Sequence, residues 1–251
     1  MSIELLLALP VMLPLGGAAF TLLLRHQARI QLWVAILTLV AIVCVALLLG
    51  YYVTQAGVLV LQIGNWTPQL GIVLVADRLT ALMLLVSSVV TLAVLVYSSA
   101  QTVSENIERT PVAIYHPTYL ALTAGVSMAF LAGDLFNLYV GFEVLLAASY
   151  VLLTLGGSAS RVRAATTYVI VSLLSSVFFL AAIAAVYAAV GTVNLAEMAV
   201  RLDGLESGTR MILELMLLVA FAIKAAIFPL SAWLPDSYPT APAPVTAVFA
   251  G

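Results

Sequence analysis

The chain has 251 residues, of which 64% are hydrophobic and 8% are charged, and its formal net charge is −2. Soluble domains carry about 25% charged residues, so this composition excludes a soluble globule, and the lack of any basic run excludes a nucleic-acid-binding protein. The single cysteine, Cys44, excludes a disulfide within the chain and every paired-cysteine metal or haem motif. We therefore predict an all-α, multi-pass membrane protein, because its apolar runs do not alternate as barrel strands do.

Seven apolar stretches come close to the length that crosses a bilayer as a helix, about 20 residues. Pro10 and Pro14 are expected to bend the first stretch without ending it, and the Gly133-Asp134 pair divides a longer run into two. We expect spans at about 3–24, 30–52, 78–97, 118–132, 135–155, 164–190 and 211–230. The sixth exceeds a membrane thickness, which predicts that it is tilted.

The segments between these spans are predicted to be loops. The stretch 53–76 is polar and uncharged, and it holds Trp66, a residue type that anchors proteins at the membrane interface. Two further loops are expected over 98–117, which is polar, and over 193–210, which is charged. The proline-rich tail becomes apolar at Val245, where we expect the opening of an eighth helix and hence a chain that is the N-terminal portion of a longer one.

The distribution of arginine predicts the orientation, because positive residues favour the inner side of a membrane. If the N-terminus lies outside, five arginines fall in inner loops, namely Arg25, Arg29, Arg109, Arg161 and Arg163. Three fall in outer loops, namely Arg78, Arg201 and Arg210. This bias favours an outside N-terminus.

Lys224 is the only lysine of the chain, and it lies inside the apolar stretch 211–230. A charge at membrane depth costs about 2.5–3.5 kcal/mol on insertion scales, so a lysine at this position indicates a use for its charge. The alternative is an ammonium that extends to the membrane interface. Ser231, the nearest polar residue on its C-terminal side, is roughly 10 Å away along a helix, which exceeds a comfortable reach.

Glu143 is the matching acid, and it lies roughly 13 Å along the helix that begins after Asp134. Tyr139 precedes it by four residues and shares its helix face. Removal from water favours the neutral form of an acid or an amine, whereas an opposite charge nearby favours the charged form. A Glu143–Lys224 pair that closes and opens would therefore transfer a proton. The alternative is a neutral glutamic acid that hydrogen-bonds to a neighbouring helix.

Proline is expected to break the span that carries Lys224. Pro229 has no N–H, so the carbonyl group of Ala225, four residues earlier, loses its helix partner. A broken helix with a polar side chain at the break is typical of ion sites near the middle of a membrane. Proline kinks also occur without ion chemistry, so the combination of Lys224 and Pro229 carries this inference.

Other polar residues are weaker candidates. Asp134 begins a helix, where its carboxylate complements the helix dipole, and capping is favoured over gating as its role. Ser175 and Ser176 either pack against a neighbouring helix or belong to a chain of hydroxyl groups. His26 and His116 are expected in loops and form no ligand cluster, so neither a metal nor a cofactor is predicted.

Two segments resemble a known family, the antiporter-like membrane subunits. They are FLAGDLFNLYVGFEVLLAASYVLL over residues 130–153 and AFAIKAAIFPLSAWLPDSYPTAPAPVTAVFAG over residues 220–251. The family includes the A and D subunits of the Mrp-type Na⁺/H⁺ antiporter and the proton-pumping subunits of NADH–quinone oxidoreductase. The strings GDLFNL with FE, and LPDSYPTAP with PVTA, are most similar to the Mrp D subunits. The resemblance implies that Glu143 and Lys224 are both essential to proton movement.

The resemblance also implies an architecture of about fourteen helices with two inverted five-helix repeats. Accordingly, residues 1–251 form one transmembrane domain, with lead-in helices over about 3–97 and a first half-repeat over about 113–251. Its seventh helix is expected to be discontinuous, and its eighth is expected to be cut short by the end of the chain.

The function implied is that of a subunit of a multisubunit monovalent cation/proton antiporter, not an enzyme, in a bacterial cell membrane. Other membrane subunits are the expected partners, and Na⁺ is the expected cation from the resemblance alone. Two alternatives stay open. One is a proton-translocating subunit of NADH–quinone oxidoreductase or of a membrane-bound hydrogenase, and the other is a scaffold that does not conduct.

Overall fold

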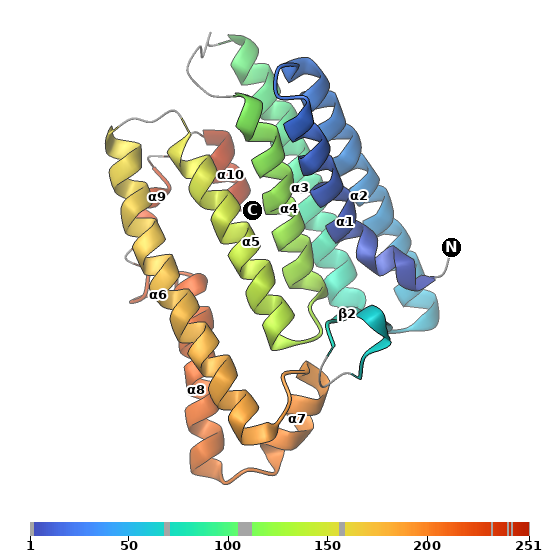
Figure 1. The fold of residues 1–251 in the computed structure, drawn as a ribbon, viewed down its shortest axis with the longest axis vertical. Coiled ribbons are helices and arrows are strands. Elements are labelled where there is room, and N and C mark those ends of the chain that lie inside the picture. The colour runs from blue at the N-terminus through green and yellow to red at the C-terminus, as the bar shows by residue number, and fades with distance from the viewer. Residues whose placement is uncertain are drawn as a thin grey trace.

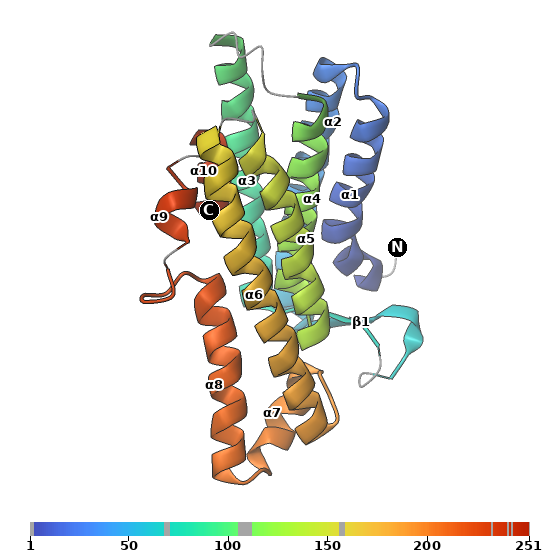
Figure 2. The same ribbon diagram turned by 60° about the vertical axis from the view of Figure 1, so that its left-hand side comes forward.

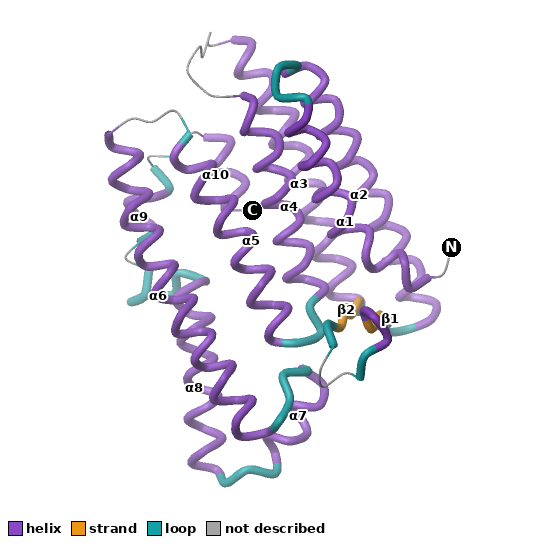
Figure 3. Tube along the Cα trace, in the orientation of Figure 1, coloured by secondary structure: helices purple, strands orange, loops and turns teal. Residues whose placement is uncertain are grey.

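The computed structural model describes residues 3–67, 71–104, 112–155, 159–231, 233–239, 241 and 243–250. Long helices stand side by side along the longest axis of the molecule, and a short pair of strands lies near the lower ends of the first five helices, above the short helix Leu195–Asp203 (Figures 1 and 3). We call the end that carries the strands and residues 190–206 the hairpin face. The end that carries residues 24–27, where the first helix joins the second, is called the opposite face.

The helices are α1 (Ile3–Leu23), α2 (Ala28–Ala56), α3 (Arg78–Ser104), α4 (Val112–Leu131), α5 (Leu135–Thr154), α6 (Ala159–Val190), α7 (Leu195–Asp203), α8 (Ser207–Lys224), α9 (Leu234–Ser237) and α10 (Ala243–Ala250). The strands are β1 (Leu59–Gln62) and β2 (Val73–Ala76), and a 3₁₀ turn follows β1 at Ile63–Asn65. Pro10 and Pro14 lie inside a continuous α1.

Within the described residues, five helices are long and apolar enough to cross a membrane. They are α1, α2, α3, α5 and α6, and each matches a predicted span. The other two predicted spans are also helical. α4 packs mainly on α5 and α1, whereas α8 is shortened by a break after Lys224. The prediction of a multi-pass helical membrane protein is therefore confirmed.

The prediction of a loop over 53–76 was wrong, because this stretch forms an antiparallel hairpin. Leu59 pairs with Ala76 and Gln62 pairs with Val73, so the two strands satisfy each other's backbone groups. Leu74 and Ala76 are buried against α1 and α2. β-Branched valines favour strands, but the polar residues between the two short apolar runs LVLQ and VLVA indicated a loop.

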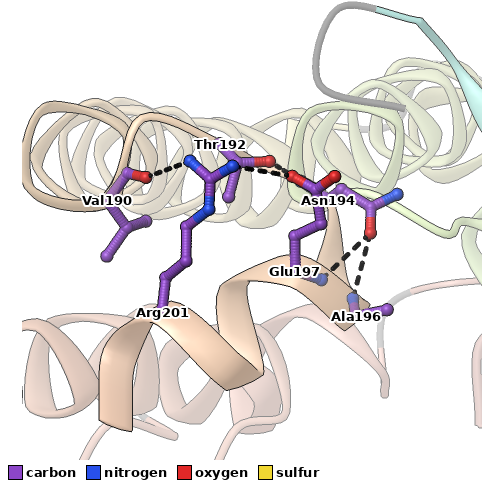
Figure 4. A network of polar contacts seen from close by, with 6 residues as sticks. All are labelled: Val190, Thr192, Asn194, Ala196, Glu197 and Arg201. Carbon is purple, nitrogen blue, oxygen red and sulfur yellow. Dashed lines mark hydrogen bonds and ion pairs between the residues drawn. The ribbon is translucent and has the colours of Figure 1, made fainter. Parts of the chain in front are cut away.

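The prediction of a loop over 193–210 was also wrong, because this stretch contains α7. Asn194 caps the helix, and its Oδ1 accepts hydrogen bonds from the backbone N–H groups of Ala196 and Glu197 at 3.1 and 3.2 Å. The guanidinium of Arg201 reaches back to the carbonyl oxygen of Val190 at 2.8 Å and to Glu197 at 3.4 Å (Figure 4). A capped helix with an (i, i+4) ion pair thus lies where charge alone indicated a loop.

The start of the fourth helix also differs from its prediction. α4 begins at Val112 and not near residue 118, so His116 lies within a helix and is 6% exposed. Pro117 cannot donate to the carbonyl oxygen of Ala113, and Nε2 of Gln31 donates to that oxygen instead, at 3.2 Å. A buried glutamine on α2 therefore compensates for a proline inside α4.

Two glycines allow α4 and α5 to pack closely. A Cβ atom at Gly125 would lie 2.6 Å from the backbone nitrogen of Leu145, and one at Gly141 would lie 2.9 Å from that of Ala129. Small residues at such crossings let membrane helices approach until their backbones touch. This contact fixes the position of α5, the helix that carries Glu143.

Candidate functional site

The helix that carries Lys224 ends at that residue. α8 stops at Lys224, Ala226 has a φ of 50°, and the next helix of the described chain is α9, which begins at Leu234. The discontinuity predicted from Pro229 is therefore present, but it begins one turn earlier, directly after Lys224. α6 and α8 lie side by side in both views, with α5 next to α6 (Figures 1 and 2).

The ammonium group of Lys224 contacts two neighbouring helices. Its Nζ donates a hydrogen bond to Oγ of Ser176 on α6 at 3.2 Å. The same atom lies 5.1 Å from the ring centroid of Phe142 on α5, which is the geometry of a cation–π contact. The side chain of Lys224 is half-buried, with one of these contacts on α6 and the other on α5. The charge is therefore held by one hydroxyl group and one aromatic ring.

Glu143 follows Phe142 on α5, and its side chain is also half-buried. Its Oε1 is shielded from solvent and has no hydrogen-bond partner among the residues that the structure describes. In its ionised form, this carboxylate would interact electrostatically with Lys224 and with two tyrosines of its own helix, Tyr139 and Tyr150. Within the same residues no ion pair joins Glu143 and Lys224. The two groups are thus within electrostatic range but separated.

A cavity of about 410 Å³ lies beside Lys224. Most of its lining is apolar, and its polar lining residues are Ser87, Thr91, Thr123, Ser149, Tyr168, Ser172, Ser175, Lys224, Trp233 and Tyr238. Oγ of Ser175 is buried there with no hydrogen-bond partner among the described residues. A water molecule occupies about 30 Å³ and needs two to four polar partners, so water can bind in this cavity only where its hydroxyl groups lie close together.

Aromatic residues border the cavity where the chain folds back after the break. Trp233 packs against Tyr168 with ring centroids 5.2 Å apart, and the hydroxyl groups of Tyr168 and Ser149 lie 2.9 Å from each other. Tyr168, Ser149 and Trp233 were not predicted as site residues. Tyr168 precedes Ser172 by four residues, a spacing that places both on one helix face, whereas only the folded chain brings Trp233 to them.

The remaining predicted residues lie away from the cavity. The ring of Tyr139 packs on that of Phe179, with centroids 6.0 Å apart. Asp134 is 2% exposed and caps α5 at the hairpin face. Its carboxylate accepts from the backbone N–H of Asn137 at 2.6 Å and from that of Val73 in β2 at 3.1 Å. Asp134 therefore joins the hairpin to α5.

No group of three histidine, cysteine, aspartate or glutamate side chains that could hold a metal ion occurs among the described residues. The chemistry available at the site is therefore that of one amine and several hydroxyl groups on a largely apolar cavity, with one carboxylic acid, Glu143, on the neighbouring α5. Such a set can hold, release and pass on protons.

Residues 132–251 match a family described as NADH:quinone oxidoreductase/Mrp antiporter, TM. The chain is 38% identical over 247 residues to the D subunit of the Na(+)/H(+) antiporter of Alkalihalophilus pseudofirmus, a match that covers 98% of this chain and 49% of that protein. It is 42% identical over 255 residues to the D subunit of the probable K(+)/H(+) antiporter of Rhizobium meliloti, covering 98% and 46%. The chain spans about half the length of these curated relatives.

A solved structure shows the same arrangement of helices. The chain superposes on one chain of the Mrp complex from Dietzia sp. DQ12-45-1b with a TM-score of 0.89 and 34% sequence identity. That match covers 100% of this chain and 46% of the other. The hairpin and α7, which the sequence did not predict, thus lie within a chain that aligns with that structure over its full length.

Proposed function

Because residues 132–251 match the family of NADH:quinone oxidoreductase and Mrp antiporter transmembrane subunits, and the chain is similar to antiporter D subunits, we propose that it works within a multisubunit monovalent cation/proton antiporter. The observation that carries the proposal is the position of Lys224. Lys224 is the last residue of a broken helix, and it lines a cavity that also carries several hydroxyl groups. Its ammonium donates to Ser176 and lies within electrostatic range of Glu143. A charged amine in this setting is a proton carrier whose partner changes.

We propose that Lys224 alternates between Ser176 and Glu143. With Ser176 as its partner, the ammonium is separated from the acid and can release its proton to water in the cavity. With Glu143 as its partner, the amine is held in its protonated form, because an adjacent carboxylate favours the charged state. Ser175 would connect Lys224 with the cavity water, since its hydroxyl lines the cavity and has no partner among the described residues.

Further parts of the proposal follow from the relatives. The exchanged cation would be Na⁺, as the name of the relative from Alkalihalophilus pseudofirmus states for that protein, and other membrane subunits would complete the complex. The N-terminus would lie outside a bacterial cell membrane, which places the hairpin face outside as well. Residues 3–97 would serve as lead-in helices, and residues 113–251 would belong to a first half-repeat.

Proton flux in membrane vesicles tests the proposal. Vesicles that contain the complete complex are given a Na⁺ or K⁺ pulse, and the change in internal pH is followed with a fluorescent dye. Lys224→Ala should abolish the cation-dependent flux, and Glu143→Gln should reduce it at least tenfold, a loss of about 1.4 kcal/mol. Glu214→Gln is the matched control, because Glu214 is exposed on α8 and pairs with Arg210. Unchanged flux in Lys224→Ala would favour the non-conducting scaffold.

A redox-driven proton pump is the second candidate, because the matching family covers NADH:quinone oxidoreductase as well as the Mrp antiporter. Lys224 and Glu143 would do the same work in such a pump, but electron transfer in partner subunits would drive it. Purification of the complex separates the two candidates. Flavin and iron–sulfur subunits that co-purify with the chain, together with proton flux that requires an electron donor, would favour the pump.

A further inference from the structure

The chain after the break is tied back to the end of α8 by Trp233. Its indole Nε1 donates a hydrogen bond to the carbonyl oxygen of Ile223 at 3.1 Å, and the side chain is 9% exposed. Ile223 directly precedes Lys224. The indole therefore binds the backbone one residue away from the ammonium group.

This contact satisfies a group that a helix end leaves open. The last carbonyl groups of a helix have no partner within it, and in apolar surroundings an unsatisfied carbonyl is costly. The carbonyl oxygen of Ile223 accepts two hydrogen bonds from the chain beyond the helix. One comes from the backbone N–H of Ala226 at 3.2 Å, and the other comes from the indole of Trp233. The indole is the longer-range of the two, because ten residues separate it from its acceptor.

The same side chain is held in place from α6. The ring of Trp233 packs on that of Tyr168 at 5.2 Å, and the hydroxyl group of Tyr168 lies 2.9 Å from that of Ser149 on α5. Tyr238 also packs on the indole, with ring centroids 6.2 Å apart. The end of α8 is thus connected through one indole to α6 and α5, the helices that supply Ser176 and Glu143.

We propose that Trp233 is a positioning residue for Lys224. It holds the end of α8 against α6, so that the ammonium stays at Ser176, beside the cavity and within electrostatic range of Glu143. This inference rests on the proposed function, since the position of Lys224 matters to flux only if Lys224 carries the proton. Three tyrosines lie closest to this arrangement as further ionisable groups, namely Tyr150, Tyr168 and Tyr238.

The unique lysine supplies a direct readout of this position. Acetic anhydride acetylates an accessible, uncharged amine, and mass spectrometry of the peptide that contains Lys224 measures the rate at one site in the intact complex. Trp233→Phe keeps an aromatic ring but removes the N–H donor. Loss of one hydrogen bond corresponds to a factor of roughly three to ten, so we expect Lys224 to be labelled three- to tenfold faster and flux to fall by a similar factor.

The control is Trp33→Phe, because Trp33 is 63% exposed on α2, away from the break. In Trp33→Phe, the rate at which Lys224 is labelled and the cation-dependent flux should equal those of the unmodified complex. Trp233→His retains a ring N–H, so it should label more slowly than Trp233→Phe, and it replaces that variant if the latter fails to assemble. Labelling of Trp233→Phe at the unmodified rate, labelling of Trp233→His as fast as Trp233→Phe, or faster labelling with unchanged flux would each overturn the inference.

Failure of this inference can be distinguished from failure of the proposed function. Labelling reports where Lys224 lies whether or not it carries protons, whereas flux in Lys224→Ala tests the carrier role alone. Loss of flux in Lys224→Ala with normal labelling and flux in Trp233→Phe would overturn the positioning role and leave the proposed function intact. Normal flux in Lys224→Ala would remove the proposed function, and the positioning role would fall with it.

Discussion

Replacement of Gly125 by alanine should separate the two helices at the centre of the bundle. The added Cβ would lie 2.6 Å from the backbone nitrogen of Leu145 and 2.9 Å from its Cα, where an ordinary contact needs 3.4 Å or more. The obstructing atoms belong to the backbone and cannot turn aside, so α4 and α5 must move apart by about 0.8 Å. Overpacking of this kind costs about 3 kcal/mol at the upper end of its range.

Helix propensity partly offsets this cost in the free energy of unfolding. Alanine is favoured over glycine in a helix by about 1 kcal/mol, so the net loss for Gly125→Ala should be about 2 kcal/mol. Gly16→Ala is the matched control, because Gly16 lies in α1 and a Cβ there meets nothing within 4 Å. That variant should gain up to about 1 kcal/mol. The two substitutions are chemically identical and are expected to differ in sign.

Thermal unfolding of the purified complex in detergent, followed by tryptophan fluorescence at one scan rate, measures both variants. Gly125→Ala should lower the transition temperature and Gly16→Ala should leave it unchanged or raise it. Gly125→Ala should also reduce cation-dependent flux, because displacement of α5 moves Glu143 relative to Lys224. An equal rise in transition temperature for both variants would refute the close contact between α4 and α5.

Two further predictions concern carboxylates at the hairpin face. Asp134→Ala should lower the free energy of unfolding by about 2–4 kcal/mol, because it leaves the buried N–H groups of Val73 and Asn137 without an acceptor; Glu206→Ala, at a helix start without a side-chain cap, should change it little in the same thermal assay. The N–H of Thr80 donates to Asp77 at 2.7 Å and holds the pKa of that carboxyl group below its ordinary value of 3.8. Asp77→Asn keeps a capping oxygen and removes only the charge, so it should cost roughly 0.3–1 kcal/mol at neutral pH. That difference is fully present above the ordinary pKa and should vanish as the pH falls through the lower, folded-state value, and a difference that grows in acid would contradict it.

The spans were predictable because lipid imposes a simple rule on composition. Each stretch expected to cross the membrane forms a helix, except that the one over 211–230 is helical only as far as Lys224, because only helices satisfy the backbone of such a segment in hydrocarbon. Errors arose where tertiary contacts override composition. Gln31 compensates for Pro117 and lets α4 start earlier, and a cap from Asn194 makes a helix of a charged stretch.

The site could be predicted only in part, for a related reason. Lys224 and Glu143 are conspicuous as charges inside apolar runs, and their role in proton transfer stays a prediction. Pro229 predicts a break near itself, yet the helix ends after Lys224, because proline affects the turn that precedes it. Trp233 and Tyr168 are ordinary aromatic residues of an apolar chain, and their roles depend on how the chain folds back after the break.

The hydrogen bonds at the hairpin face fix the chain near one end of α8, whereas Lys224 lies at the other end. Main-chain hydrogen bonds run from Gly133 to Val73, from Leu135 to Val193 and from Leu195 to Gly133, so β2, α5 and the start of α7 are fastened together at that face. α8 begins near this face at Ser207, and Lys224 is the last of its 18 residues, about 27 Å away along the helix axis. A rotation of α8 by about 5° about this point would displace the ammonium of Lys224 by about 2.4 Å, which would break its hydrogen bond to Ser176.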